Sequence, residues 1–147
     1  MELVDKIGSV LDRKGRDIWS VAPDTSVYDA IALMSEKQVG ALLVLSEGGL
    51  IGIISERDYA RKVILKGKAS RETYVWEIMS QPVICVPPEC TVEQTMALMT
   101  EKRVRHLPVV EDETVVGVIS IGDVVRAIIE EKEYYIQQLT SYITACG

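Results

Sequence analysis

A chain of 147 residues that is 48% hydrophobic and 26% charged has the composition of a folded globular protein and not of a disordered one. Its net charge of −6 argues against broad, non-specific binding to nucleic acid, which depends on neutralising phosphates with Lys and Arg. No apolar run approaches the length of a membrane span, and the first residues lack the basic start and apolar stretch of a secretion signal. We therefore expect a cytoplasmic protein with no membrane partner.

The spacing of apolar residues and turn signals predicts the elements of the first half of the chain. In chain order they are a helix over 3–13, a strand over 18–21, a helix through 37 capped at 24–26, strands over 41–45 and 50–54, and a helix from 56 to about 65. Residues 66–74 are polar and are the natural linker.

The second half is expected to copy this order. It contains a strand over 83–86, a helix over 92–102, strands over 107–110 and 115–119, and a helix from 123. The last helix continues past the copied region with a nearly heptad-spaced apolar row, namely Val125, Ile129, Ile136, Leu139 and Ile143. Such a row packs either on the body of its own chain or on a second copy in a dimer, and both readings stay open.

The chain is an internal duplication. Residues 18–64, moved forward by 65 positions, lie on 83–129 without a gap, and 17 of the 47 pairs are identical. The matches include Gly52-Ile53-Ile54-Ser55 on Gly117-Val118-Ile119-Ser120, and Asp58 on Asp123. A repeat restricts the possible architectures before any single motif is considered. Because there are just two copies, a long solenoid is excluded.

We therefore predict an α/β protein of two β-α-β-β-α repeats related by a pseudo-twofold axis and packed sheet to sheet, because each copy alone would have a marginal core. The expected boundaries are a lead-in helix over 1–16, a first repeat with its linker over 17–75, and a second repeat with a helical extension over 76–147.

The stretch Gly-apolar-apolar-Ser-x-x-Asp occurs twice, as Gly52 to Asp58 and as Gly117 to Asp123. With Val104-Arg105-His106-Leu107-Pro108-Val109-Val110, these motifs resemble the tandem domains named after cystathionine β-synthase, the CBS pair, over roughly residues 7–130. The whole chain looks like the small, stand-alone bacterial members. The resemblance implies a regulatory module, not an enzyme, that binds an adenosine-containing ligand between the repeats: AMP first, then ATP or ADP, or NAD.

The residues suit such a ligand. The serine hydroxyl and the amides at the start of the following helix favour phosphate, and the aspartate can accept from both ribose hydroxyls. The competing explanation is structural, because Ser-x-x-Asp is also a helix capping signature. The two explanations can hold together.

The resemblance assigns two sites. One comprises Ser9, Ile18, Arg105, His106, Val118, Ser120, Gly122 and Asp123. The mirror site comprises Ser80, Val83, Ile53, Ser55, Arg57 and Asp58. Gly40-Ala41 stands where the first site has Arg105-His106, so the mirror site lacks two phosphate donors, and Arg57 restores one charge. We expect unequal sites, with the monophosphate at Asp123, and a dinucleotide across both halves as a further possibility.

Other classes of function have weaker support. The three cysteines, Cys85, Cys90 and Cys146, lack the spacing of a metal site and are expected to be reduced. Cys85 and Cys90, which lie within the repeats, are expected to be buried and unreactive. The acidic residues are scattered along the predicted helix faces, so the sequence shows no paired-carboxylate site of the kind an enzyme would use. A basic patch of Lys62, Lys66, Lys68 and Arg71 is typical of solvated surface more than of nucleic-acid binding. A ligand-free dimerisation scaffold is the remaining alternative, and the regulated partner protein is unknown.

Overall fold

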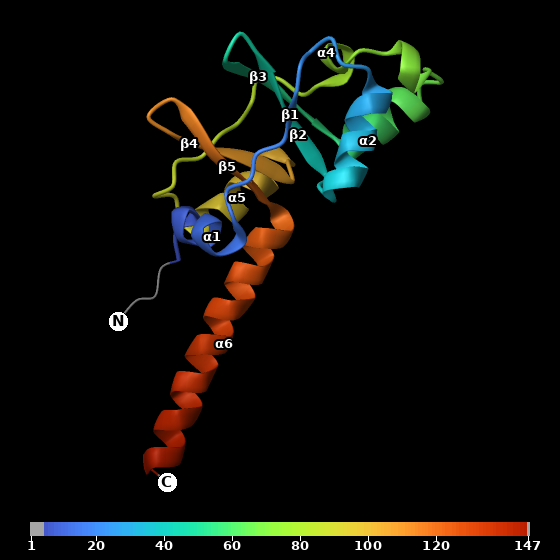
Figure 1. The fold of residues 1–147 in the computed structure, drawn as a ribbon. Coiled ribbons are helices and arrows are strands. Elements are labelled where there is room, and N and C mark those ends of the chain that lie inside the picture. The colour runs from blue at the N-terminus through green and yellow to red at the C-terminus, as the bar shows by residue number, and fades with distance from the viewer. Residues whose placement is uncertain (1–4, 147) are drawn as a thin grey trace. The chain divides into compact units, whose positions relative to one another are not determined.

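The structure, a computed structural model, describes the backbone of residues 5–146 and the side chains of residues 5–140 (Figure 1). The chain divides into two compact units, one of Ile18–Ile84 and one that joins Met1–Asp17 to Cys85–Gly147. Each unit contains one copy of the repeat. The predicted α/β class with two repeats is confirmed.

The unit of Ile18–Ile84 is built on a three-stranded sheet. Strand β1 (Ser20–Val21) runs parallel to β2 (Ala41–Ser46), and β2 pairs antiparallel with β3 (Gly49–Ser55). Helix α2 (Val27–Lys37) connects β1 to β2, and its N-cap Ser26 accepts a hydrogen bond from the Asp29 amide. The core is aliphatic, since no Phe is present: Val27, Ala30, Met34, Leu42, Val44, Ile54, Val63, Val75 and Ile78.

The helical region after β3 is more divided than the sequence predicts. Helix α3 (Glu56–Tyr59) continues directly into a π-helical turn, Ala60–Ile64. A 3-10 turn (Ser70–Glu72) lies inside the expected linker, and a further helix, α4 (Val75–Ile78), follows it. Sequence periodicity missed α4 because four residues are too few to repeat an apolar pattern, although Val75 and Ile78 are fully buried.

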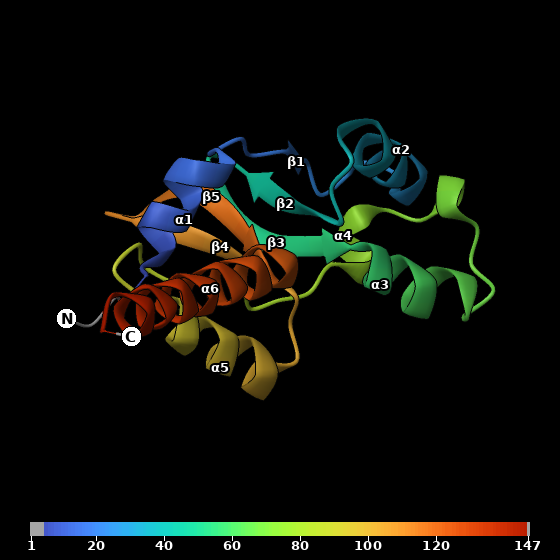
Figure 2. The ribbon, with the colours of Figure 1, turned by 90° about the horizontal axis from the view of Figure 1, so that it is seen from below.

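The other unit places the N-terminal helix beside the second repeat. Helix α1 (Ile7–Lys14) is joined to the segment before α5 (Val92–Lys102) by backbone bonds from Ile7 N–H to the Cys90 carbonyl and from Gly8 N–H to the Pro88 carbonyl, both 2.9 Å. Strands β4 (His106–Glu111) and β5 (Thr114–Ser120) form an antiparallel pair. In Figure 2 the long helix α6 (Ile121–Cys146) runs between α1 and α5.

The strand predicted over 83–86 is wrong. Among the described residues of this segment, only Val86 pairs with the sheet, through a single parallel bridge to Val109. The Val86 amide donates to the Pro108 carbonyl and the Val86 carbonyl accepts from Val110. In the first repeat the Leu43 amide donates to the Trp19 carbonyl, but Pro108 stands at the position equivalent to Leu43 and has no N–H to donate, so the ladder does not extend to the residues before Val86.

The duplication extends to backbone irregularities. A bulge interrupts β2 pairing between Val44 and Leu45, and another interrupts β4 pairing between Val109 and Val110, 65 positions on. Helices α2 and α5 both end in a left-handed residue with φ of 56°, at Gln38 and Arg103. Both copies therefore fold by the same local rules, even where those rules depart from regular structure.

The paired glycines of the β3 and β5 strands make room for a neighbouring side chain. A Cβ at Gly117 would lie 2.8 Å from both terminal methyls of Leu11 on α1. A Cβ at Gly52 would lie 2.5 Å from the Met79 sulfur. Each of these glycines therefore leaves room for a packed side chain of its own unit.

Candidate functional site

Asp58 closes a capping box at the start of α3. The Ser55 hydroxyl accepts from the Asp58 amide at 3.1 Å, and the Asp58 Oδ2 atom accepts from the Ser55 amide at 3.0 Å. The Ser55 hydroxyl also donates to the same oxygen at 3.1 Å. The capping explanation of the motif therefore holds for this copy.

The other oxygen of Asp58 is occupied as well. Its Oδ1 atom accepts from the Ser80 hydroxyl at 3.1 Å and pairs with the Lys62 ammonium at 3.0 Å. Ser80 is held there by reciprocal backbone hydrogen bonds with Ile53. Both oxygens of Asp58 are therefore satisfied by protein groups, and the residue is only 8% exposed to solvent.

The structure therefore brings together four of the six residues predicted for the mirror site, namely Ile53, Ser55, Asp58 and Ser80. Arg57 is exposed on α3, and no ion pair to it is found among the described side chains. Val83 is partly buried in the same unit, in a segment without regular structure.

Asp123 repeats the capping box at the start of α6 but has a different cationic partner. The Asp123 Oδ2 atom accepts from the Ser120 amide at 2.9 Å, and the Ser120 hydroxyl accepts from the Asp123 amide at 3.1 Å. The Lys14 ammonium, from α1, donates to the same Oδ2 at 2.6 Å and to the Val118 carbonyl at 2.9 Å.

The Oδ1 atom of Asp123 is less occupied. The Arg126 guanidinium is its cationic neighbour among the described residues and lies 3.7 Å away, which is beyond hydrogen-bonding distance. An ionised carboxylate oxygen has two acceptor sites, so Oδ1 can accept hydrogen bonds that its counterpart in Asp58 already receives from Ser80 and Lys62. The two motifs are therefore unequal in acceptor capacity.

The remaining residues predicted for the Asp123 site are spread over the same unit, with one exception. His106 begins β4 and is partly buried, whereas Arg105 is exposed, and its carbonyl accepts from the Ile121 amide at 2.8 Å. Gly122 is exposed in the first turn of α6, and Ser9 is exposed on α1. Ile18 belongs to the other unit.

Electrostatics favours an ionised Asp123 and a neutral His106. Burial raises the pKa of Asp123, but the hydrogen bonds from Lys14 and Ser120 and the Lys14 charge together hold that pKa below its ordinary value. Burial lowers the pKa of His106, against the opposing pull of Asp123. A neutral imidazole offers a phosphate one N–H and no charge, so Arg105 is the stronger donor of the pair.

Sequence analysis missed both lysines as partners of the two aspartates. Lys62 follows Asp58 by four residues on a helix, a spacing that does predict an ion pair, but it was assigned to a basic patch. In that patch Arg71 also has a partner, since it stacks on the Tyr28 ring at 4.0 Å. Lys14 precedes Asp123 by 109 residues, and no local pattern could have connected them.

The cysteine prediction needs one correction. Cys85 is exposed, as is the equivalent residue Ser20 of β1, while Cys90 is partly buried and accepts a hydrogen bond from the Thr95 hydroxyl. Both are free thiols. Partial burial raises the pKa of Cys85, which disfavours the thiolate that a nucleophile requires. Cys146 lies outside the described side chains.

No cluster of three or more metal-ligating side chains is found within the part of the chain that the structure describes. No helix in that part is long and apolar enough to cross a membrane.

Replacing Lys14 by methionine should destabilise the protein more at pH 7 than at pH 3. The folded-state pKa of Asp123 is depressed, so its ion pair stabilises the fold above the unfolded pKa of about 3.9 and is lost as pH falls through the folded value. We expect the difference in unfolding free energy between the parent protein and Lys14→Met, measured by urea unfolding, to shrink steadily below pH ~4. Lys66→Met, at an exposed position, is the matched control, and a Lys14→Met difference that stays constant with pH would contradict the assignment.

The CBS domain profile matches the chain twice, over residues 8–65 and 75–130. The chain belongs to the CBS-domain family. Among its relatives, a mitochondrial CBS domain-containing protein of Arabidopsis thaliana, CBSX3, is 44% identical over 93% of this chain and 71% of its own length. A protein with CBS domains from Burkholderia ambifaria MC40-6 is 46% identical, with a TM-score of 0.82 over 85% of this chain and 94% of its own.

Two further solved structures share the CBS-pair fold. A hexameric CBS-CP12 protein from bloom-forming cyanobacteria is 30% identical, with a TM-score of 0.76 over 84% of this chain and 68% of its own. The CBS domain pair of protein MJ0100, in complex with 5′-methylthioadenosine and S-adenosyl-L-methionine, is 23% identical, with a TM-score of 0.78 over 88% of this chain and 99% of its own. At that identity the second likeness shows the fold alone.

Proposed function

We propose that this CBS pair is a regulatory module that binds an adenine nucleotide at the Asp123 motif, with AMP ranked first, and ATP, ADP or NAD next. The observation that carries the proposal is the unequal occupancy of the two duplicated carboxylates. Oδ1 of Asp123 has acceptor capacity for a ribose hydroxyl, while both oxygens of Asp58 are taken by protein donors.

The groups around Asp123 suit a monophosphate. Arg105 is exposed and presents a guanidinium that can fork onto phosphate oxygens, and Gly122 leaves the first turn of α6 open, since a Cβ there would meet only the Ser120 hydroxyl at 3.7 Å. The ammonium of Lys14, whose side chain is 33% exposed, lies beside the carboxylate and adds a second positive charge for an anionic ligand. The Asp58 motif has Gly40 and Ala41 in place of Arg105 and His106, which supports weaker binding there.

The proposed mechanism is a shift of population. A nucleotide favours whichever conformation of the module binds it more tightly, and a partner protein responds to that conformation. The CBS pair of MJ0100 binds adenosine-containing ligands, which supports adenylates as the first probes for this chain. The proposal involves no chemical step and no catalytic cofactor.

Titration calorimetry with AMP, ATP, ADP and NAD tests the proposal, with GMP and ribose 5-phosphate as controls for base and sugar. We expect AMP to bind at one site per chain and to raise the thermal midpoint, because a ligand at 100 times its Kd stabilises the folded state by about 2.7 kcal/mol. A protein that ignores all four adenylates at millimolar concentration would instead be a ligand-free scaffold, and ATP hydrolysis would place it among enzymes.

A further inference from the structure

The packing of α1 holds the Lys14 ammonium beside the Asp123 carboxylate. Lys14 is the last residue of α1, and the buried Leu11 of the same helix fills the space that Gly117 leaves in β5. Val118, the next residue of that strand, supplies the carbonyl that accepts from Lys14 at 2.9 Å. The contact between helix and strand therefore positions the ammonium as well as the carbonyl that it bonds.

The turn that follows Lys14 leaves the carboxylate open. Gly15 ends α1 with a φ of 107°, and among the described residues other than its chain neighbours no heavy atom lies within 4 Å of where its Cβ would be. Moved forward by the 65 positions that relate the two repeats, Gly15 falls on Ser80, whose hydroxyl occupies Oδ1 of Asp58. The glycine therefore explains why Oδ1 of Asp123 lacks the corresponding hydroxyl.

The cation beside Asp123 is a feature of this motif alone. The same offset places Lys14 on Met79, which is uncharged. It places Lys62, the lysine that pairs with the aspartate of the first motif, on Ala127. A lysine without a counterpart in the other copy is not part of the shared helix cap, so its contribution has to be sought in what this one site binds.

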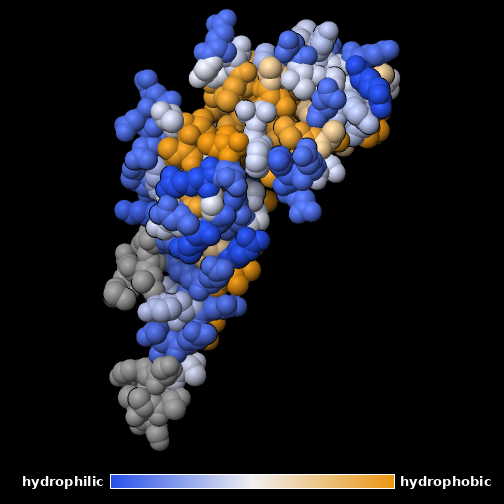
Figure 3. All heavy atoms as spheres, viewed as in Figure 1, coloured by the Kyte–Doolittle hydropathy of each residue, from blue (hydrophilic) through white to orange (hydrophobic). Residues whose placement is uncertain are grey.

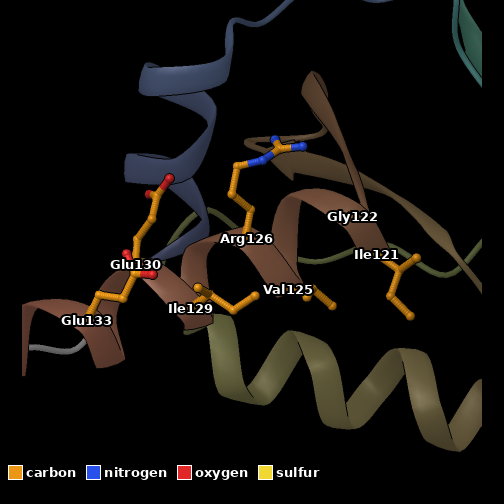
Figure 4. A pocket seen from close by; sticks show the side chains of 7 residues that line it. All are labelled: Ile121, Gly122, Val125, Arg126, Ile129, Glu130 and Glu133. Carbon is orange, nitrogen blue, oxygen red and sulfur yellow. The ribbon is translucent and has the colours of Figure 1, made fainter. Parts of the chain in front are cut away.

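The other charged groups beside the Lys14–Asp123 pair cancel one another. A hollow of about 200 Å³ between α1 and α6 adjoins the pair, and its further charged members are Arg13, Arg126 and Glu130. Arg13 is paired with Asp5 at 2.6 Å. Figure 4 shows Arg126 and Glu130, which are opposite in charge, on successive turns of α6, and Figure 3 shows a mostly hydrophilic surface over α1.

Lys14 therefore decides the charge that a ligand meets at Asp123. A carboxylate alone attracts cations and repels phosphate, whereas a carboxylate with an ammonium at 2.6 Å is neutral as a pair. The exposed guanidinium of Arg105 then leaves a net positive charge, and burial lowers the pKa of His106, so this imidazole adds no charge at neutral pH. Without Lys14, the charges of Asp123 and Arg105 would cancel.

We propose that Lys14 is a specificity-determining residue of the Asp123 site: it neutralises the carboxylate that binds the sugar, so that the site selects adenosine ligands with an anionic 5′ group over those with a cationic one. An ammonium has three N–H donors, and two of them reach Asp123 and Val118, so the third can donate to the ligand. This inference rests on the proposed function, because it concerns which ligand that site accepts.

Three ligands that share adenosine and differ in charge test the role of Lys14. AMP is anionic, adenosine is neutral, and S-adenosylmethionine has a positively charged sulfur at the 5′ position. Titration calorimetry on the parent protein should give the highest affinity for AMP and the lowest for S-adenosylmethionine. In Lys14→Met we expect the affinity for AMP to fall roughly tenfold or more, that for adenosine to change by less than about threefold, and that for S-adenosylmethionine to rise.

Two further variants separate charge from structure. Lys14→Arg retains the positive charge, so it should retain the order of affinities of the parent protein. Lys102→Met, at an exposed position at the end of α5, removes one positive charge from the same unit and should leave all three affinities unchanged.

The ratio of the affinities for AMP and adenosine is the decisive quantity, because a loss of folded protein lowers the binding of both ligands equally. A ratio in Lys14→Met equal to that of the parent protein would overturn the role of Lys14 and leave the nucleotide site intact. A parent protein that binds none of the three ligands would overturn the proposed function, and this inference with it.

Discussion

Replacing Asp123 by asparagine is expected to weaken AMP binding roughly 10- to 150-fold, because a hydrogen bond to a charged group contributes roughly 1.5–3 kcal/mol. The change removes the charge that would hold a ribose hydroxyl at Oδ1. It retains a side-chain oxygen that can accept from the Ser120 amide, so the start of α6 is kept. Titration calorimetry gives the affinity, and circular dichroism checks the helix content.

Asp58→Asn is the matched control for this prediction. It makes the same change in the equivalent capping box, where Ser80 and Lys62 already occupy the second oxygen. We expect it to leave the tight AMP site nearly unchanged and to lower stability instead. Equal losses of affinity in both variants would contradict the proposed inequality, and tight AMP binding by Asp123→Asn would remove Asp123 from the site.

Alanine at Gly117 is expected to destabilise the unit of the second repeat by about 1–3 kcal/mol, the usual cost of overpacking a core. The new methyl would lie 2.8 Å from both terminal methyls of Leu11, which is fully buried and cannot move into solvent. Chemical unfolding measures the loss. Leu11→Ala combined with Gly117→Ala should remove the clash, so the two changes together should cost less than the sum of the single ones.

Gly52→Ala is the comparison in the first repeat. Its methyl would meet the Met79 side chain, which is flexible and only partly buried, so it can rotate aside. We expect a smaller loss of stability than at Gly117. Equal losses of stability in the two glycine variants would contradict this explanation. They would show that the cost comes from the strand position itself and not from the neighbouring side chain, Leu11 or Met79.

Much of the fold was predictable because the chain is duplicated. An offset of 65 residues locates equivalent strands, helices and caps in both halves, and it also predicts that Ser55–Asp58 and Ser120–Asp123 behave alike at their helix starts. These are local interactions within four residues, which sequence spacing records directly. The strand expected at Val83–Val86 failed because its partner strand carries Pro108, which lacks the N–H that Leu43 supplies at the equivalent position of the first repeat.

The amino-acid sequence by itself determined the repeat, the α/β class and the two capping aspartates, because each depends on residues close together in the chain. Only the tertiary structure decided what surrounds those aspartates: Lys14 reaches Asp123 across 109 residues, and Ser80 reaches Asp58 across 22. The order of residues carries no record of such distant contacts. They arise because packing of α1 on the second repeat, and pairing of Ser80 with Ile53, bring these side chains to one carboxylate each.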